Sequence, residues 1–271
     1  MTDAKPLVPV NPEGLEEIAK SLLKGDPQIA NTGTNVRTPE SYIILPGKMH
    51  GSYSYPDLLV AMHRLSYEAE LAAKTLGLSL QNTATEQDGS QYIGNINWEQ
   101  ALRLNLLLGN FTLTPRQFVD FKELLEEGVK GKKVYDGKGA VIDSKVLEEV
   151  HDEIFAVRSP YRAEWLDAYF KAVDDRLQMN YNHRMVNGVL KPQNSEQLKK
   201  CLMQDSYVSL ASANRQGLPT RKSKSQMYYL YPRDKAVAGF IADSDWVGLY
   251  CNGSPKSLSW SVGVRAAKIK R

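Results

Sequence analysis

The C-terminal stretch of the chain, residues 237–269, reads VAGFIADSDWVGLYCNGSPKSLSWSVGVRAAKI. Small or apolar residues alternate in it with residues of no consistent chemistry, which stand at every second position: Ile241, Asp243 and Asp245, and then Gly248, Tyr250, Asn252 and Ser254. Since successive side chains of a strand point to opposite faces, the pattern predicts one fixed face and one face free to vary. An ordinary edge strand followed by a polar loop is the alternative interpretation.

The composition indicates a folded globular protein. Of the 271 residues, 42% are hydrophobic and 24% are charged, which suits one large domain or two ordinary ones. The formal net charge of +3 is small for this length and argues against a nucleic-acid-binding protein. Short basic clusters at residues 130–133, 221–224 and 265–271 are interpreted as solvated surface.

Cysteine usage and the N-terminal sequence bear on location. Cys201 and Cys251 are too few for a disulfide framework and lack the spacing of a zinc site, although a single bridge between them stays open. The N-terminus has no basic start followed by an apolar run, and no apolar stretch approaches the ~20 residues that span a bilayer. We therefore expect a cytoplasmic protein with no membrane span, while a place on a virion or cell surface stays open.

The first half of the chain predicts mostly helices. Asn11-Pro12 begins a short helix that ends at Gly25, and this helix and the polar link after it form an arm over residues 1–40. Residues 41–45 are expected to form a strand. Further helices are expected where apolar residues recur at helical spacing between capping residues, at 56–76, 97–108, 114–125 and 144–155.

The second half predicts mostly strands. Asp136-Gly137 and Asn187-Gly188 indicate hairpin turns. Strands are expected at residues 207–213, 226–231, 237–241 and 263–269, and a short helix at 195–204. This order is typical of the α+β class, in which helices pack on antiparallel sheets.

The sequence carries no recognisable catalytic or metal-binding motif. None of the four histidines is spaced to form a metal-binding pair on a helix, and the GxSxG, Walker and GxGxxG patterns are absent. The acidic pairs Glu148-Glu149 and Asp174-Asp175 have no partner that suits acid–base chemistry. We therefore expect no enzymatic activity, no catalytic residue, no bound metal and no cofactor. Calcium binding stays open as an alternative, through Asp136, Asp143, Asp243 and Asp245, although their spacing does not match an EF-hand loop.

Aromatic residues are frequent in the last fifty positions. Tyrosine and tryptophan supply large and rigid contact area, so they suit a binding surface as well as a core. Trp246 and Trp260 are expected in the core because they bracket the variable segment. Tyr250 fits either role.

The segment of residues 97–118 reads NWEQALRLNLLLGNFTLTPRQF and carries a family resemblance. It resembles the W-x-x-A helix, the glycine and the following turn of C-type-lectin-fold domains of the formylglycine-generating-enzyme-like kind. The ending of those domains is similar to Gly263-Val264-Arg265. The resemblance covers most of residues 41–271 and implies a C-type-lectin-like domain there, with an insertion at about residues 128–215. The catalytic cysteines of that enzyme have no counterpart in this chain.

The stretch of residues 237–269 is similar to the variable region of the variable proteins of diversity-generating retroelements, particularly archaeal and viral ones. In that family a reverse transcriptase rewrites adenines of a template repeat, so asparagine codons become codons for a bounded set of residues. Ten positions hold residues of that set: Ile241, Asp243, Asp245, Gly248, Tyr250, Asn252, Ser254, Ser257, Leu258 and Ser259.

The resemblance implies that these ten residues form the ligand-contact surface, with Tyr250 as the anchor. It further implies that the intervening residues hold the scaffold, among them Ala242, Ser244, Trp246, Leu249 and Cys251. The expected function is ligand binding: the diversified surface recognises a macromolecular target, a protein or a cell-surface ligand. The identity of the ligand, the host or virus, and the oligomeric state stay open.

Two functions of other classes are kept as alternatives. The first is an enzyme or cofactor-dependent domain on the same fold, which a metal analysis or a deep pocket lined by histidines and acids would favour. The second is a nucleic-acid-binding protein that uses the basic C-terminal segments, whose binding would fall steeply with salt. Its contacts would come from Lys222, Lys224, Lys268 and Lys270.

Overall fold

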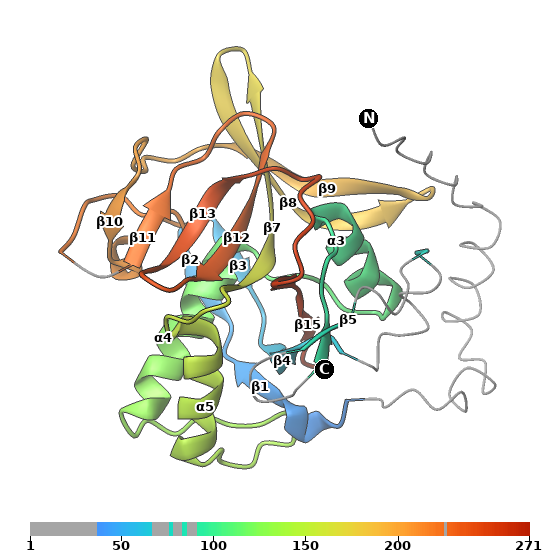
Figure 1. Ribbon diagram of the computed structural model, residues 1–271, viewed down its shortest axis with the longest axis vertical. Helices are drawn as coiled ribbons and strands as arrows, with labels where there is room; N and C mark the ends of the chain where they lie inside the picture. Colours follow the sequence, from blue (N-terminus) through green and yellow to red (C-terminus); the bar gives the residue numbers. More distant parts are fainter. Residues whose placement is uncertain (1–36, 67–75, 78–82, 86–90, 225–226) are drawn as a thin grey trace.

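The first and last described strands of the chain meet in one sheet. The computed structural model describes residues 37–66, 76–77, 83–85, 91–224 and 227–271 (Figure 1). β4 (Leu58–Arg64) lies in the middle of a three-stranded antiparallel sheet, between β1 (Tyr42–Leu45) and β15 (Arg265–Ile269). The C-terminal segment is therefore fixed to the beginning of the described fold.

A second, larger sheet has eight strands, in the order β10-β11-β13-β12-β7-β8-β9, with β14 beside β7 (Figure 1). Neighbours run antiparallel, except that β13 is parallel to β11 and β14 is parallel to β7. The strands are β7 (Arg162–Val173), β8 (Arg176–Val186), β9 (Val189–Gln197), β10 (Ser206–Val208), β11 (Met227–Leu230), β12 (Ala236–Ala242), β13 (Val247–Gly253) and β14 (Val262–Gly263).

Small elements complete the described fold. Two short hairpins pair neighbouring strands: β2 (Lys48–His50) with β3 (Tyr53–Tyr55), and β5 (Thr83–Thr85) with β6 (Gln91–Ile93). Two 3₁₀ turns are η1 (Pro39–Ser41) and η4 (Leu210–Ser212).

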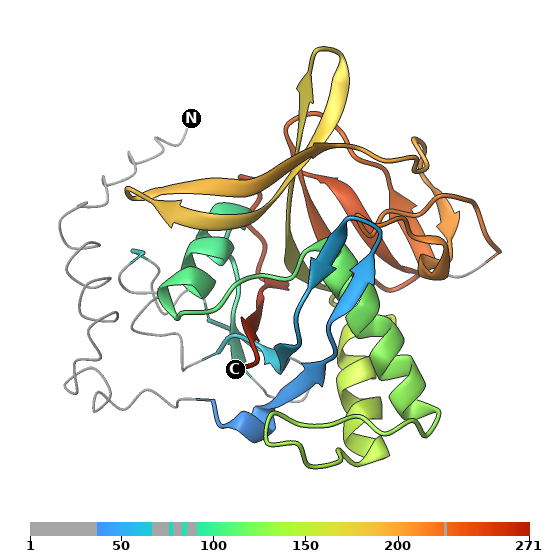
Figure 2. The same ribbon diagram turned by 180° about the vertical axis from the view of Figure 1, so that it is seen from behind.

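Three α-helices lie in the described part of the chain, and each begins at a capping side chain. Asn97 and Thr114 form capping boxes at the starts of α3 (Trp98–Leu107) and α4 (Pro115–Val129), and Asp143 caps α5 (Ser144–Phe155). α4 and α5 pack together on one side of the large sheet, and α3 packs near β7 and β8 (Figures 1 and 2). None of the helices in the described ranges is long and apolar enough to cross a membrane.

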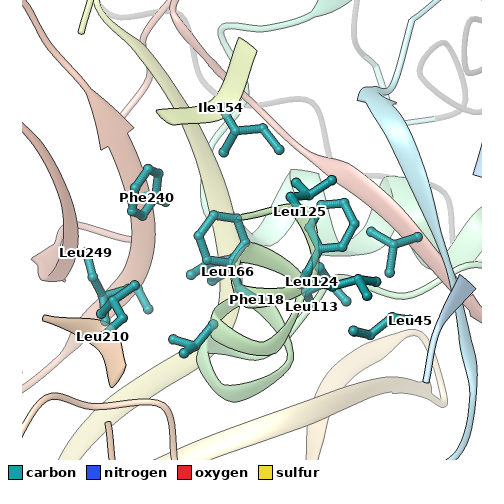
Figure 3. Close-up of a cluster of buried hydrophobic side chains, with 14 of the residues drawn as sticks. Leu45, Leu113, Phe118, Leu124, Leu125, Ile154, Leu166, Leu210, Phe240 and Leu249 are labelled. Carbon is teal, nitrogen blue, oxygen red and sulfur yellow. The ribbon is translucent and has the colours of Figure 1, made fainter. Parts of the chain in front are cut away.

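The main core lies between the α4–α5 pair and the large sheet (Figure 3). The ring of Phe240 on β12 packs 4.9 Å from Phe118 of α4 and 5.1 Å from Phe155 of α5, measured between ring centroids. A second buried cluster gathers around Trp98 of α3 and Trp165 of β7. Both indole nitrogens are satisfied, since each donates a hydrogen bond to a backbone carbonyl.

The α+β class and most of the predicted elements are confirmed. The three-stranded sheet is antiparallel, whereas the eight-stranded sheet is mixed. α3 and α4 begin where Asn97 and Thr114 predicted, and α5 spans the predicted residues 144–155. The strands near residues 41–45, 226–231, 237–241 and 263–269 are present. Asn187-Gly188 connects β8 to β9. Both residues have positive φ, 52° and 72°, as the expected hairpin turn requires.

The helix predicted over residues 56–76 is wrong in its described part, because residues 58–64 form β4. This strand is the middle one of its sheet, and Leu58, Val60, Ala61 and Met62 are all buried. A strand covered on both faces loses the alternation that distinguishes it from a helix in sequence. Residues 67–75 of the same prediction lie outside the described residues.

Other predictions are wrong in smaller ways. No helix forms at residues 195–204, where β9 ends at Gln197 and irregular chain follows. The strand predicted over residues 207–213 ends at Val208, and η4 follows it. The long strand β7 was not predicted at all. It belongs to the expected insertion of residues 128–215 and lies inside the large sheet, between β12 and β8.

The predicted N-terminal arm falls mainly on residues 1–36, which lie outside the described residues. The same holds for its short helix between Asn11 and Gly25. Only the last residues of the arm, which include η1, are described.

A buried ionic network joins the C-terminal strand to the rest of the fold. Arg265 of β15 is 2% exposed, its Nε lies 3.2 Å from Glu164 Oε2, and its Nη1 donates to the carbonyl oxygen of Ala61 at 2.8 Å. Arg162 is also buried, and its Nη2 lies 2.9 Å from Glu153 Oε1 and 3.3 Å from Glu164 Oε2. The network connects β4, β7, β15 and α5.

Glu153 remains ionised within this network. Burial alone would raise the pKa of its carboxyl group, but the guanidinium of Arg162, the hydrogen bond with His63 and the charge of Arg265 together hold the pKa well below its usual range. The burial of the ionised Glu153 carboxylate is therefore compensated only while the arginines remain in place.

Arg265→Met is expected to lower the free energy of unfolding by about 3–5 kcal/mol, because it takes one guanidinium from a buried carboxylate. Urea unfolding followed by circular dichroism measures the change. Lys268→Met, on the same strand but partly exposed, is the matched control and should cost less than about 1 kcal/mol. Equal losses for the two variants would contradict this role of the network.

Candidate functional site

Successive side chains of β12 and β13 point alternately to the main core and to the opposite face of the large sheet. Val247, Leu249 and Cys251 of β13 pack with the main core, on the side of α4 and α5. Tyr250 and Asn252 therefore point to the opposite side, which we call the outer face of the large sheet. Residues paired in register share this face: Ala163 and Trp165 of β7, Gly239 and Ile241 of β12, Gly248, Tyr250 and Asn252 of β13, and Tyr228 and Leu230 of β11.

A cavity of about 350 Å³ opens on the outer face. Its size lies at the small end of the range for ligand pockets, roughly 300–1,000 Å³. The sheet supplies one part of the lining, and the loop of residues 254–261 between β13 and β14 supplies another. The lining residues are Tyr161, Ala163, Trp165, Leu230, Ile241, Trp246, Tyr250, Asn252, Gly253, Ser257, Leu258, Ser259 and Val262.

The loop of residues 254–261 is held through its backbone. The amide of Asn95 donates to the carbonyl oxygen of Ser259 at 2.9 Å, and the hydroxyl of Tyr92 donates to the carbonyl oxygen of Trp260 at 2.6 Å. These bonds do not depend on the loop's own side chains. Leu258 and Trp260 are accordingly 58% and 52% exposed, although the loop that carries them is tethered.

Tyr250 lies across two glycines on the outer face. A Cβ atom at Gly239 would overlap the hydroxyl and ring of Tyr250, and one at Gly253 would lie 2.8 Å from its Cε2 atom. The ring also packs against Trp165, with 6.0 Å between centroids and 68° between planes. Burial raises the pKa of the Tyr250 hydroxyl, so this group stays protonated at neutral pH. The glycines therefore provide the space in which the ring is held.

Six of the ten predicted contact residues line the same cavity: Ile241, Tyr250, Asn252, Ser257, Leu258 and Ser259. They come from β12, from β13 and from the following loop. None of them belongs to the buried core of the molecule, although Ile241 and Tyr250 pack against the edge of the second cluster. The structure thus brings most of the predicted site together.

Three other predicted residues lie in turns outside the cavity. Asp243 and Asp245 belong to the tight turn between β12 and β13, in which the amide of Asp243 donates to the carbonyl oxygen of Trp246 at 2.8 Å. The carboxylate of Asp243 accepts a hydrogen bond from the amide of Ser244. Ser254 is exposed at the turn that opens the loop of residues 254–261. These positions can contact a large ligand but not a group inside the cavity.

The prediction that Gly248 belongs to the contact surface is corrected by the structure. Gly248 is buried and does not line the cavity. A Cβ atom at this position would overlap the carbonyl oxygen of Tyr228 and lie 2.8 Å from the ring of Trp246. Because backbone cannot move aside cheaply, a side chain at position 248 requires a rearrangement of the sheet.

Some of the predicted scaffold residues are buried, as expected, and others are exposed. Ala242, Leu249 and Cys251 are buried as expected. Ser244 is exposed in the turn between β12 and β13. The core placement of both tryptophans is wrong: Trp246 is partly exposed and lines the cavity, and the side chain of Trp260 faces solvent.

Sequence reasoning missed the cavity residues that come from outside the C-terminal stretch. Tyr161 and Trp165 belong to the segment around β7, and Leu230 ends β11. Tyr161 also fixes the loop, since its hydroxyl is hydrogen-bonded to the Ser259 hydroxyl. The pairing of β7 with β12 brings Tyr161 and Trp165 to the site, and the pairing of β11 with β13 brings Leu230. The local sequence gives no signal for either pairing.

The strongest ionic cluster away from the cavity surrounds Asp120 of α4. Its carboxylate accepts a hydrogen bond from Tyr55 at 2.5 Å, and it contacts Arg116 at 2.8 Å, Lys48 at 3.1 Å and His50 at 2.8 Å. Burial alone would raise the pKa of Asp120, but the hydrogen bond from Tyr55, the charge of Arg116 and the contact with Lys48 together lower it. The cluster fastens the β2–β3 hairpin to α4 and occupies the carboxylate fully.

The described residues hold no group of three or more histidine, cysteine, aspartate or glutamate side chains that could bind a metal ion. Both cysteines are free thiols. Burial raises the pKa of Cys201 to about 11 and that of Cys251 well above its usual value. At neutral pH both thiols are therefore protonated, which is the less nucleophilic form.

Comparison of the chain with protein-family models, with curated proteins and with solved structures finds no match.

Gly239→Ala is expected to lower the free energy of unfolding by about 1–3 kcal/mol, because the new methyl group overlaps the Tyr250 ring. In a Tyr250→Ala background the same substitution should be neutral or slightly stabilising, since the overlap is gone. Urea unfolding of the two single variants and the double variant measures this coupling. Equal effects of Gly239→Ala in both backgrounds would show that the glycine does not serve to hold the ring.

Proposed function

We propose that this chain is a ligand-binding protein of C-type-lectin-like fold, whose outer face recognises a macromolecular target. The observation that carries the proposal is the convergence of six predicted contact residues on one cavity, while their neighbours along β13 pack in the core. A concave site with apolar walls and a few polar groups is the usual form of a ligand-binding site. Targets of this kind include proteins and cell-surface ligands.

Three features support the lectin-like part of the proposal. The first and last described strands lie in one sheet, on either side of β4. The helix that resembles the W-x-x-A motif forms as α3 and is followed by the capped helix α4. The ending Gly263-Val264-Arg265 is buried at the junction of the two sheets. These features support a scaffold, built by other parts of the chain, that carries the C-terminal stretch.

The proposal extends to diversification of the outer face, as in the variable proteins of diversity-generating retroelements. Substitution at positions such as Asn252, Ser257 and Leu258 removes no core contact, because these side chains lie outside both buried clusters. The loop that carries two of them is held by backbone hydrogen bonds. A surface built in this way can change its chemistry without a large loss of stability.

The two alternatives have less support than target binding. The lysines of the nucleic-acid hypothesis lie near two different sheets: Lys222 pairs with Val208 of β10 in an isolated bridge, whereas Lys268 lies on β15. Lys270 is moreover paired with Asp57 at 3.8 Å. For the enzyme hypothesis, the cavity lining offers neither a histidine nor an acidic residue for proton transfer. We therefore propose binding rather than catalysis.

The genomic DNA around the coding sequence tests the proposed diversification. A near-copy of the DNA that encodes residues 237–269 is expected beside a reverse transcriptase gene, and the two copies should differ only at adenines of the template. The expected differences fall in the codons of the contact residues and spare those of Leu249 and Cys251. A complete genome without such a repeat would contradict active diversification of this surface.

A further inference from the structure

We infer that the cavity on the outer face takes an uncharged side chain, aromatic or branched aliphatic, which a loop of a protein partner presents. This inference rests on the proposed function of the outer face. It adds the chemistry of the group that enters the cavity and the kind of molecule that carries it.

The lining of the cavity selects against a charged group. None of its 13 residues is acidic or basic, and four of them are aromatic: Tyr161, Trp165, Trp246 and Tyr250. A charged group that enters such a site loses its hydration and meets no opposite charge, which opposes binding. Apolar surface that enters the same site is removed from water, which favours binding.

The polar part of the lining consists of neutral groups. The hydroxyls of Tyr161 and Ser259 are hydrogen-bonded to each other and stabilise the wall. Within the described part of the chain, the side chains of Asn252 and Ser257 make no hydrogen bond. A neutral amide and a neutral hydroxyl suit the phenol of an incoming tyrosine or the indole N–H of a tryptophan.

An aromatic surface continues from the cavity toward the edge of the sheet. Trp246 lines the cavity, the ring of Tyr228 lies 5.5 Å from it, and the ring of Tyr207 lies 5.0 Å from Tyr228, measured between centroids. Tyr207 is 52% exposed. A free small molecule in the cavity would leave this row uncovered, whereas a protein loop whose side chain enters the cavity can cover both.

Three phenols of similar size test the preference for an uncharged group. 4-Ethylphenol is neutral, tyramine is its cationic counterpart and 4-hydroxyphenylacetate is its anionic counterpart. Each is titrated into the full chain, and the backbone amide signals of Tyr250, Asn252 and Ser257 are followed by ¹H–¹⁵N NMR. We expect 4-ethylphenol to bind at least about tenfold more tightly than either charged phenol. Equal or tighter binding of a charged phenol, or no shift with any of the three, would overturn the inference.

A charge added to the lining gives the matched comparison. Leu258→Asp is expected to weaken the binding of 4-ethylphenol by about tenfold or more and to strengthen that of tyramine. Val141→Asp is the control, because Val141 is 57% exposed, like Leu258, and lies outside the cavity. The control should leave both affinities unchanged. Equal effects of the two variants would place phenol binding elsewhere on the molecule.

A library of disulfide-closed peptides, displayed on phage and selected on the full chain, tests the protein source of the side chain. Selected peptides are expected to share an uncharged aromatic or branched aliphatic residue and to compete with 4-ethylphenol. Tyr207→Ala should weaken them by about tenfold or more and leave the binding of 4-ethylphenol unchanged. If Tyr207→Ala leaves the peptides unaffected, or if the shared residue is charged, the inferred partner is wrong.

The proposed function of the outer face and the inferred occupant of the cavity can be disproved independently. A cavity that prefers a charged phenol would overturn the inferred occupant, although a genomic template repeat would still support a diversified binding surface. Conversely, a preference for 4-ethylphenol without any repeat would leave a binding site for an uncharged side chain on a surface that is not diversified.

Discussion

The rest of the fold depends on the burial of Arg265, because its guanidinium needs partners from three other elements. Glu164 comes from β7, the carbonyl oxygen of Ala61 comes from β4, and Glu153 comes from α5. A charge that is buried without partners is strongly destabilising, so these elements must be assembled correctly before Arg265 can be covered. β15 begins at this residue, and only β14 and Val264 separate it from the loop of residues 254–261 that borders the cavity. The end of the stretch of residues 237–269 is thereby fixed by contacts that none of the ten predicted contact residues makes.

On the outer face, the two-residue period of a strand separates the residues proposed to bind a ligand from those that pack in the core. On β13, Leu249 and Cys251 stabilise the core, while Tyr250 and Asn252 between and beside them face the cavity. Two outward-facing residues do not follow this division between the core and the outer face. Gly248 faces outward but has no room for a side chain, and Tyr250 needs the space above Gly239. The surface that can change freely is therefore smaller than the alternation in the sequence suggests, and it shifts toward the loop of residues 254–261.

The sequence predicts well those features that have local signals and poorly those that depend on distant pairing. The capping residues Asn97 and Thr114 mark the starts of α3 and α4, since a cap involves only neighbouring residues. β4 resembles a helix in sequence because it is covered on both faces: Leu58, Val60 and Met62 belong to the main core, and Ala61 belongs to the second cluster. Trp260 is exposed for a similar reason: its backbone is held by Tyr92, 168 residues away in sequence, so its side chain is not needed for packing. The part of the cavity that comes from β7 could not be predicted until β7 was known to pair with β12.

The most direct test of this account is a saturation scan of residues 237–269, with resistance to a protease as the measure of folding. The account predicts that tolerance follows the two faces: Asn252 and Leu258 should accept most residues, polar and large ones included. Leu249 and Cys251 should accept only small apolar residues or near-isosteric ones, because they are buried against α4 and α5. If substitutions at Asn252 and Leu258 unfold the protein as readily as those at Leu249 and Cys251, the outer face is part of the fold and not a surface free to vary.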